Sequence, residues 1–216
     1  MIAMKVSEIF FSIQGEGVHI GLPTVFLRLF ACDLRCSWCD TMYAVEGTDF
    51  REMKTAEVLS RILGYGCSRV CITGGEPLIQ RDAVEEVTEF LLERDFVVVL
   101  ETSGHKKPPG IFSHPNSVVS MDCKCPGSGM DSKMDFSLYD ALGEKDQLKF
   151  VIADAADYEY AMGVIAKRRI RASIIFQPVY GTKADWIAER ILRDRMEDVR
   201  VLPQLHKIFW GEKRGV

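Results

Sequence analysis

Apolar residues are grouped along this chain in short runs typical of buried β-strands. Six runs are rich in Val, Ile, Phe and Leu and do not alternate cleanly with polar residues, as expected for parallel strands that are covered on both faces. The pattern predicts strands at Thr24–Phe30, Val70–Thr73, Phe96–Glu101, Ser117–Met121, Gln147–Ile152 and Ser173–Gln177.

Segments with helical periodicity lie between several of these strands. Each places its apolar residues on one face, and the predicted helices are Thr55–Gly64, Arg81–Arg94, Tyr158–Arg168 and Lys183–Arg193. Strands that alternate with helices form βαβ units with right-handed crossovers. We therefore predict an α/β fold, a partial, open (β/α)6-type barrel of mainly parallel strands, in a single domain over residues 1–216.

Composition limits the class of protein. The 216 residues are 47% hydrophobic and carry a formal charge of −4, so a sizeable core is expected and a general attraction to nucleic acid is not. No apolar run approaches the roughly 20 residues that cross a bilayer, and residues 1–11 lack the apolar centre of a signal peptide. We expect a cytoplasmic protein with no membrane partner.

Polar clusters follow the predicted strands. In parallel barrels the carboxyl ends of the strands meet on one rim and build the site. We therefore expect a single large pocket lined by residues 32–41, 73–77, 101–104 and 122–124, with Lys149 and Gln177 from the last two strands.

Cys32, Cys36 and Cys39 stand at C-x3-C-x2-C spacing directly after the first predicted strand. Three neighbouring thiolates can hold three irons of a [4Fe-4S] cube, which leaves the fourth iron open to a non-protein ligand. Such an open coordination position predicts reactivity.

Two other uses of these thiols compete with an iron–sulfur cluster. A structural zinc ion is normally bound by four protein ligands, so a fourth ligand would have to come from elsewhere in the chain. The other candidates, Cys67, Cys71, Cys123 and Cys125, do not form the C-x2-C pair that is typical of zinc sites. A disulfide framework is typical of much shorter chains with an even number of cysteines, whereas this chain has 216 residues and seven cysteines. A reducing compartment and an iron–sulfur cluster fit the pattern better.

The cysteine loop resembles the cluster-binding motif of radical S-adenosylmethionine (SAM) enzymes, in which an aromatic residue, here Trp38, lies against the adenine. Gly74-Gly75-Glu76 after the next strand resembles the GGE motif of the same enzymes, which binds the methionine amino group. Taken alone, this glycine pair would indicate a tight turn. The resemblance implies a [4Fe-4S] cluster and SAM as cofactors.

Further motifs narrow the resemblance. Residues 12–17 (SIQGEG), Arg28, Cys39-Asp40-Thr41 and residues 202–207 (LPQLHK) are similar to the 7-carboxy-7-deazaguanine synthase family. This family converts 6-carboxy-5,6,7,8-tetrahydropterin to 7-carboxy-7-deazaguanine with loss of ammonia, in queuosine and 7-deazapurine biosynthesis. The resemblance further implies Mg²⁺, a shortened radical SAM barrel, a homodimer and an external electron donor such as flavodoxin or ferredoxin.

The family motifs imply specific site residues. The substrate-binding set is Ile13, Gln14, Gly15, Arg28 and Thr73. The SAM-binding set is Trp38, Cys39, Asp40, Gly74, Gly75, Glu76, Ser103, Ser120, Asp122, Lys124 and Gln177. Cys32, Cys36 and Cys39 would hold the cluster, Thr41 would bind Mg²⁺, and no protein side chain is expected to be catalytic beyond the cofactor-bound radical.

Structural alternatives remain open for several of these residues. Arg28, a cation on an apolar strand, could pair with the substrate carboxylate or with an internal Glu or Asp. Thr41 could cap a helix, and Ser103 and Gln177 could serve in turns or caps. The residues His206 and Lys207 receive no assigned role.

Two other functions compete with this hypothesis. A small activase that makes a glycyl radical on a protein partner shares the cysteine spacing, but Gln14, Glu16 and Arg28 favour a small anionic heterocycle. An electron-transfer or iron-sensing protein would close its cluster with four cysteines and would not need the Gly74-Gly75-Glu76 turn.

Overall fold

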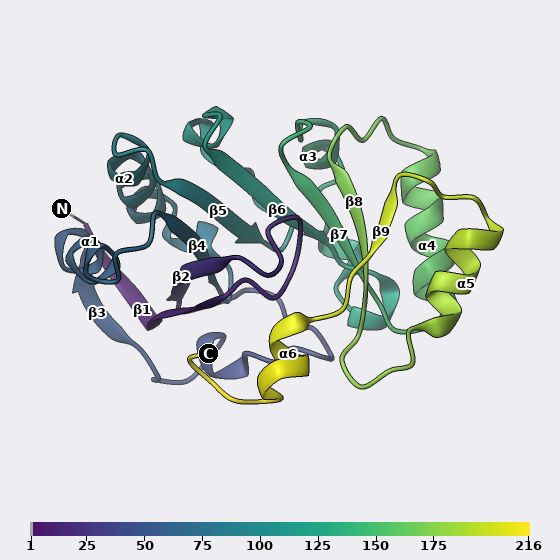
Figure 1. Ribbon diagram of the computed structural model, residues 1–216, viewed down its shortest axis with the longest axis horizontal. Helices are drawn as coiled ribbons and strands as arrows, with labels where there is room; N and C mark the ends of the chain where they lie inside the picture. Colours follow the sequence, from purple (N-terminus) through teal and green to yellow (C-terminus); the bar gives the residue numbers. More distant parts are fainter. Residues whose placement is uncertain (1) are drawn as a thin grey trace.

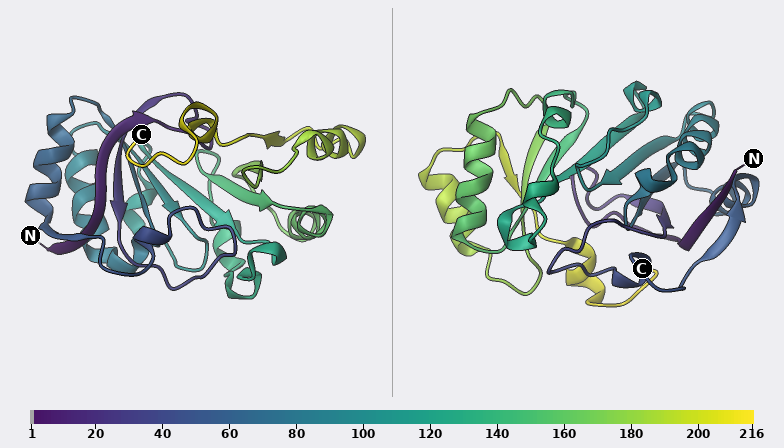
Figure 2. Two further views of the ribbon diagram at one scale, coloured as in Figure 1. Left: turned by 90° about the horizontal axis from the view of Figure 1, so that it is seen from below. Right: turned by 180° about the vertical axis from the view of Figure 1, so that it is seen from behind.

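The computed structural model describes residues 2–216 and is built on one nine-stranded sheet with the order β3-β1-β2-β4-β5-β6-β7-β8-β9. Figures 1 and 2 show this sheet curving around its concave face, with helices along the outside. The strands are β1 Ala3–Ile13, β2 Pro23–Leu29, β3 Arg51–Lys54, β4 Arg69–Gly74, β5 Val97–Thr102, β6 Ser117–Cys123, β7 Gln147–Ile152, β8 Ser173–Pro178 and β9 Val199–Val201.

Most of the sheet is parallel. Strands β2, β4, β5, β6, β7, β8 and β9 pair in parallel, whereas β1 is antiparallel to both β2 and β3. Strands β3 and β9 end the sheet and do not meet, so within residues 2–216 the barrel is open. The predicted class, an open and mainly parallel α/β barrel, is confirmed. The prediction missed β1, β3 and β9.

Helices follow most of the parallel strands. They are α1 Thr55–Gly64, α2 Arg81–Leu92, α3 Ser137–Asp140, α4 Ala155–Ala166, α5 Asp185–Arg193 and α6 Leu205–Trp210. The first predicted helix has the bounds of α1. Helix α4 begins earlier than predicted because Asp154 caps its N-terminus, accepting hydrogen bonds from the N–H groups of Ala156 and Asp157. It also ends earlier than predicted, at Ala166. Helices α3 and α6 were not predicted.

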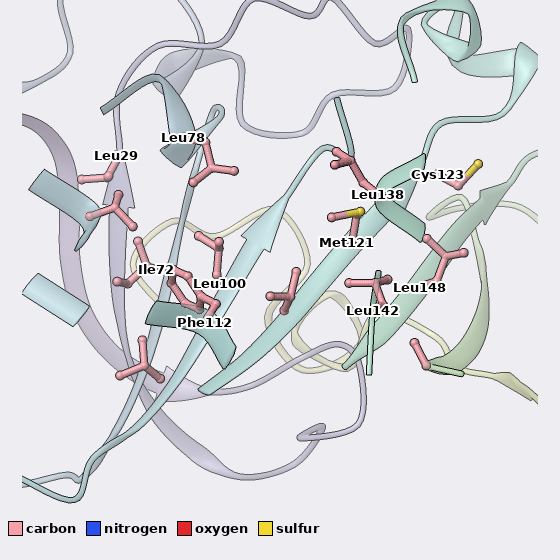
Figure 3. Close-up of a cluster of buried hydrophobic side chains, with 14 of the residues drawn as sticks. Leu29, Ile72, Leu78, Leu100, Phe112, Met121, Cys123, Leu138, Leu142 and Leu148 are labelled. Carbon is pink, nitrogen blue, oxygen red and sulfur yellow. The ribbon is translucent and has the colours of Figure 1, made fainter. Parts of the chain in front are cut away.

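The main core lies between the sheet and the outer helices. Figure 3 shows Leu29, Ile72, Leu100, Met121 and Leu148 from the successive strands β2, β4, β5, β6 and β7 in this layer. On β2 the side chains alternate. Leu27 and Leu29 join the main core, whereas Phe26 and Arg28 face a cavity on the other side of the sheet. This alternation follows from the two-residue period of a strand.

The C-terminal segment packs on the concave side against the N-terminal half of the chain. After β9 the chain crosses back, so that α6 and the C-terminal residues lie beside the loops of the N-terminal half (Figures 1 and 2). The Leu205 N–H donates to the Gly15 carbonyl at 2.9 Å, and Arg214 bonds to Glu8. Within residues 2–216, no helix is long and apolar enough to span a bilayer.

Candidate active site

A cavity of about 490 Å³ opens on the concave side, at the carboxyl ends of the parallel strands. Its walls come from the end of β1, the loops after β2, β4, β5 and β6, strand β7, the end of β8, and the C-terminal segment. The polar clusters expected at one rim therefore converge on one site, as parallel topology requires.

The cysteine loop forms one wall of this cavity. Cys32, Cys36 and Cys39 all line it. The loop is anchored at Ser37, whose N–H donates to the Ser128 carbonyl at 3.1 Å and whose hydroxyl donates to the Gly127 carbonyl at 2.7 Å.

The chemistry of the thiols suits an iron–sulfur cluster. Burial raises the pKa of the Cys32 and Cys36 thiols, and the Lys124 ammonium acts in the opposite direction on Cys36. The Leu34 N–H donates to the Cys32 sulfur at 3.4 Å, a contact that favours the thiolate. Partly buried thiols of raised pKa are best stabilised as thiolates by a metal.

The same residues do not fit a zinc ion. Within residues 2–216, no three His, Cys, Asp or Glu side chains are arranged around a single metal position. The remaining thiols, Cys67, Cys71, Cys123 and Cys125, are absent from the cavity lining of the described chain. A cube places its thiolate ligands on separate irons, so the three-thiol wall fits a cluster better than a four-ligand zinc site.

The Gly74-Gly75 turn lies next to the cysteine loop and lines the cavity. Gly74 has φ +147°, and a Cβ on it would lie 2.1 Å from the Leu29 carbonyl oxygen. A Cβ on Gly75 would lie 2.3 Å from the Ala31 carbonyl oxygen. Both positions therefore require glycine, and their backbone groups are presented to the cavity.

Glu76 lies behind the cavity wall instead of facing the cavity. It is fully buried, and its carboxylate accepts hydrogen bonds from the Thr102 hydroxyl at 2.9 and 3.0 Å, from the Ser103 N–H at 2.8 Å and from the Leu78 N–H at 2.9 Å. This carboxylate fixes the ends of β4 and β5 relative to each other. In the structure the carboxylate is engaged by Leu78, Thr102 and Ser103, and its contact with SAM stays a prediction.

The other residues predicted to bind SAM lie mostly in the cavity wall: Trp38, Cys39, Asp40, Gly74, Gly75, Ser103, Asp122, Lys124 and Gln177. Ser120 is buried in β6, and its hydroxyl accepts a hydrogen bond from the Gln147 amide at 2.6 Å. The Gln177 Oε1 is buried without a hydrogen-bond partner in the described chain. Because a buried polar oxygen without a partner is costly, Gln177 fits a bound polar ligand.

Arg28 and Thr73 are neighbours in the pairing of β2 with β4, and both line the cavity. The Arg28 Nε donates to Glu8 at 3.1 Å, and Glu8 also accepts from the Tyr43 hydroxyl at 2.9 Å and from Arg214 at 3.2 Å. The internal ion pair foreseen as an alternative is thus present. It orients the guanidinium, which still borders the cavity.

The segment Ile13–Gly15 also lines the cavity. The Gln14 amide donates to Glu101 at 3.2 Å. A Cβ on Gly15 would lie 2.0 Å from His206 Nδ1, so the glycine allows the imidazole from α6 to pack directly on this backbone. The Ile13–Gly15 segment and α6 therefore form one continuous wall of the cavity.

A row of alternating charges crosses the floor of the cavity. Glu16 and Lys149 form an ion pair, Lys149 lies 3.1 Å from Asp122, and Asp122 lies 2.6 Å from Lys124. Burial alone would raise the pKa of Glu16, but Lys149 and then His206 lower it to about 2. Burial would lower the pKa of Lys149, but Asp122 and Glu16 raise it well above its usual value. Burial also opposes the charges of Asp122 and Lys124, but their mutual attraction lowers the pKa of Asp122 and raises the pKa of Lys124. All four groups are therefore ionised at neutral pH.

Several residues that line the cavity received no binding role from the sequence motifs, although Glu101 and Lys149 were expected in the pocket: Glu16, Lys149, Glu101, Tyr180, Gln204, His206, Lys207, Glu212 and Val216. For two of these residues, Lys149 and Glu16, the sequence contains a signal that indicates a place in the site. Lys149 is a cation inside an apolar strand, and Glu16 belongs to the quoted SIQGEG segment. Tyr180, Glu212 and Val216 reach the cavity through tertiary folding that no local pattern records.

Thr41, predicted to bind Mg²⁺, lies in the cavity wall at the start of a short 3-10 helix, Met42–Ala44. Its hydroxyl is 3.8 Å from the Cys39 sulfur. The neighbouring Asp40 carboxylate is 3.2 Å from Lys207 Nζ. A hydroxyl in this position can contribute one oxygen ligand to a hard ion that keeps water and substrate oxygens.

Known proteins resemble this chain over nearly its whole length. Residues 28–109 match the Radical SAM superfamily. A 7-carboxy-7-deazaguanine synthase from Thermoplasma acidophilum is 37% identical over 99% of this chain and 100% of its own length. One from Methanospirillum hungatei is 40% identical over 95% of this chain and 85% of its own.

A solved structure shares the fold. The crystal structure of QueE from Escherichia coli matches with a TM-score of 0.77 and 23% identity, over 95% of this chain and 96% of that one. The open parallel sheet, the cysteine loop and the sequence identities agree, and this chain belongs to the 7-carboxy-7-deazaguanine synthase family of radical SAM enzymes.

Proposed function

We propose that this protein is a 7-carboxy-7-deazaguanine synthase, which converts 6-carboxy-5,6,7,8-tetrahydropterin to 7-carboxy-7-deazaguanine with loss of ammonia. One observation carries the proposal. A single cavity brings together Cys32, Cys36 and Cys39, the Gly74-Gly75 turn, and Arg28 beside the Ile13–Gly15 segment. The first two groups suit a cluster and SAM, and the third suits an anionic heterocycle. No finding supports the alternative activase function.

The cofactor wall is assigned to the cysteine loop and the adjacent strand ends. When bound, a reduced [4Fe-4S] cluster supplies the electron that cleaves SAM to methionine and a 5′-deoxyadenosyl radical. The chain's own residues bind and orient. Trp38 offers an aromatic face for the adenine, the Gly74 and Gly75 backbone allows close approach of the methionyl group, and Gln177 offers its unpartnered oxygen.

The substrate wall is assigned to the opposite side of the cavity. Arg28 would pair with the pterin carboxylate while its Nε stays on Glu8, so that the cation is held in place before the substrate binds. Thr73 lies beside Arg28 in the sheet and offers a hydroxyl. The backbone N–H and C=O groups of Ile13–Gly15 would form hydrogen bonds with the donors and acceptors along the edge of the heterocycle.

Three further assignments complete the proposal. Thr41 would bind Mg²⁺ together with substrate oxygens and water. An external donor such as flavodoxin or ferredoxin would reduce the cluster. Residues 1–216 would act as one domain in a cytoplasmic homodimer, a setting consistent with seven free cysteines.

The test is anaerobic. Reconstituted protein is incubated with dithionite, SAM and Mg²⁺, with and without the carboxypterin, and both 5′-deoxyadenosine and 7-carboxy-7-deazaguanine are measured. We expect product only when the carboxypterin is present. SAM cleavage without any deazaguanine product would contradict the proposed function and favour an activase that acts on a protein substrate.

Two cysteine variants control for the cluster. Cys36→Ser removes a cavity thiol and should lower bound iron and abolish product. Cys67→Ser changes a thiol outside the cavity, whose Sγ donates to the Pro23 carbonyl at 3.5 Å, and should leave both unchanged. Mössbauer spectra of the loaded protein should show one iron without a cysteine ligand.

A further inference from the structure

The row of charges on the cavity floor joins parts of the chain that are far apart in sequence. Lys149 on β7 contacts Glu16 from the segment after β1, and it lies 3.1 Å from Asp122 on β6. The Gln204 amide, just before α6, donates to the other Glu16 oxygen at 2.8 Å. Lys124 lies 2.6 Å from Asp122 and completes the row.

Lys149 is the central member of this row. Its side chain is 8% exposed, and it is the cation that touches both carboxylates. The pairing of β6 with β7 places Asp122 and Lys149 side by side in the sheet. A buried lysine without carboxylate partners would lose its charge or unfold its surroundings, so the row is held as a unit.

The two carboxylates that hold Lys149 belong to different walls. Glu16 adjoins the Ile13–Gly15 segment assigned to the pterin, and its N–H donates to the Gln14 side chain at 3.2 Å. Asp122 and Lys124 belong to the wall assigned to SAM, and the Lys124 charge influences the Cys36 thiol. The ammonium of Lys149 is thus a rigid spacer between the substrate wall and the cofactor wall.

We propose that Lys149 is a positioning residue that fixes the distance between the SAM-derived radical and the substrate carbon from which it takes a hydrogen atom, by tying Glu16 to Asp122. The inference rests on the proposed function. Hydrogen transfer requires the reacting atoms in close contact, and a misplacement of about 1 Å can cost about 100-fold in rate. Loss of the spacer should therefore let SAM cleavage run without transfer to the substrate.

The test compares Lys149→Met with Lys167→Met. The first variant keeps a similar chain length without the charge, and the second changes an exposed lysine at the end of α4. The quantity measured is the 5′-deoxyadenosine released per 7-carboxy-7-deazaguanine formed. We expect K149M to raise this ratio at least about tenfold and K167M to leave it unchanged. A ratio for K149M within about twofold of wild type, whatever the overall rate, would overturn the proposal.

A second measurement applies if K149M does not take up the cluster. Cluster-free protein is titrated calorimetrically with the carboxypterin, because release of Glu16 should loosen the adjoining Ile13–Gly15 segment. We expect the dissociation constant of K149M to rise about tenfold. An unchanged dissociation constant would count against the proposed role.

A double variant separates positioning from simple charge balance. Glu16→Gln combined with Lys149→Met removes both members of the pair, so no Glu16 carboxylate is left unpaired, and Asp122 keeps Lys124. If Lys149 only neutralised a buried carboxylate, the double variant would regain the wild-type ratio, which would refute the proposal. A ratio that stays high supports the spacer role.

The wild-type assay distinguishes the two proposals. If wild-type protein makes no 7-carboxy-7-deazaguanine from the carboxypterin, the proposed function fails. If wild-type protein makes product and K149M keeps the wild-type ratio, only the role of Lys149 fails.

Discussion

Arg28 shows how a strand can hold a cation in an apolar sheet. Its neighbours Leu27 and Leu29 enter the main core, while Arg28 faces the cavity above the Phe10 ring, with the guanidinium carbon 5.8 Å from the ring centroid. Glu8 takes one side of the guanidinium. The positive charge of Arg28 is thereby compensated in the free protein, and the other N–H groups of the guanidinium are left for a carboxylate ligand.

Replacement of Arg28 by Ala should weaken carboxypterin binding more than SAM binding. A hydrogen bond to a charged group contributes about 1.5–3 kcal/mol, so the dissociation constant for the carboxypterin should rise about 10- to 100-fold. Glu8 keeps Tyr43 and Arg214 as partners, and the fold should persist. Calorimetric titration with each ligand checks this result.

Arg51→Ala is the matched control for Arg28→Ala, because Arg51 is an exposed arginine on the edge strand β3, which β1 separates from β2. It should leave both dissociation constants unchanged. Equal losses of carboxypterin and SAM binding in Arg28→Ala would argue against the assigned carboxylate partner.

The pKa of Glu16 gives the protein a specific acid sensitivity. Burial opposes ionisation, but Lys149 and His206 lower the pKa from 4.5 to about 2. A carboxyl whose pKa is lower in the folded state stabilises the fold above its unfolded pKa. This contribution is therefore complete above about pH 4.5 and is lost as the pH falls toward about 2.

Glu16→Gln should remove that pH-dependent contribution. At pH 7 the variant should be less stable than wild type by on the order of 2–3 kcal/mol, and the difference should shrink between pH 4.5 and pH 2. Urea unfolding of cluster-free protein across this range measures it. Glu57→Gln, which breaks an exposed pair with Arg61, should change stability by no more than about 0.5 kcal/mol at any pH. Parallel pH profiles for wild type and Glu16→Gln would refute the assignment.

At the scale of elements, two glycines illustrate opposite demands. Gly75 lies in the turn after β4, where a Cβ would lie 2.3 Å from the Ala31 oxygen and 2.9 Å from the Ala44 oxygen. Both atoms belong to backbone and cannot rotate away. Gly163 lies inside α4, where an added Cβ meets no described atom within 4 Å.

Gly75→Ala should therefore destabilise the protein by about 1–3 kcal/mol and weaken SAM binding, because the turn must move away from the cysteine loop. Gly163→Ala, the matched control, should stabilise it by about 0.5–1 kcal/mol, since alanine is the better helix former. Urea unfolding midpoints and SAM titration measure both effects. A Gly75→Ala variant with wild-type stability and SAM affinity would show that the turn does not need to be so tight.

The sequence pattern predicted the parallel strands well because these strands are buried on both faces. Strand β7 has the predicted bounds, β2, β4 and β5 differ from the prediction by one residue at each end, and β6 and β8 extend one or two residues further at the C-terminal end. Strand β3, with the sequence REMK, has one apolar residue and is a strand because it pairs with β1. Such edge strands depend on a partner, and local periodicity does not record one.

The site was predictable in outline for a related reason. Parallel strands bring their carboxyl ends to one rim, so polar residues that follow them must meet. The pairing within the rim was not predictable. Glu16 and Lys149 are separated by 133 positions, and Glu76 turns its carboxylate toward Thr102 and Ser103 instead of the cavity.

At the scale of the whole molecule, the C-terminal segment closes one side of the cavity against the N-terminal half of the chain. Lys207 in α6 lies 3.2 Å from Asp40 and 2.8 Å from Glu212. Arg214 lies 2.9 Å from Asp49 and 3.2 Å from Glu8. The C-terminal segment is thus held by ion pairs to the N-terminal half, without pairing in the sheet.

Deletion of residues 212–216 should therefore open the cavity without unfolding the protein. The Glu212 and Arg214 side chains are 69% and 46% exposed, and such ion pairs contribute only about 0–1 kcal/mol each. Glu212 and Val216 line the cavity, however, so the wall on the substrate side is lost. We expect the KM for carboxypterin to rise about tenfold, with iron content and SAM affinity unchanged. Arg214→Ala keeps the full length but removes both ion pairs of that residue. If it reproduced the whole effect, Arg214 would act through Glu8 and Arg28, and the deleted wall itself would not matter.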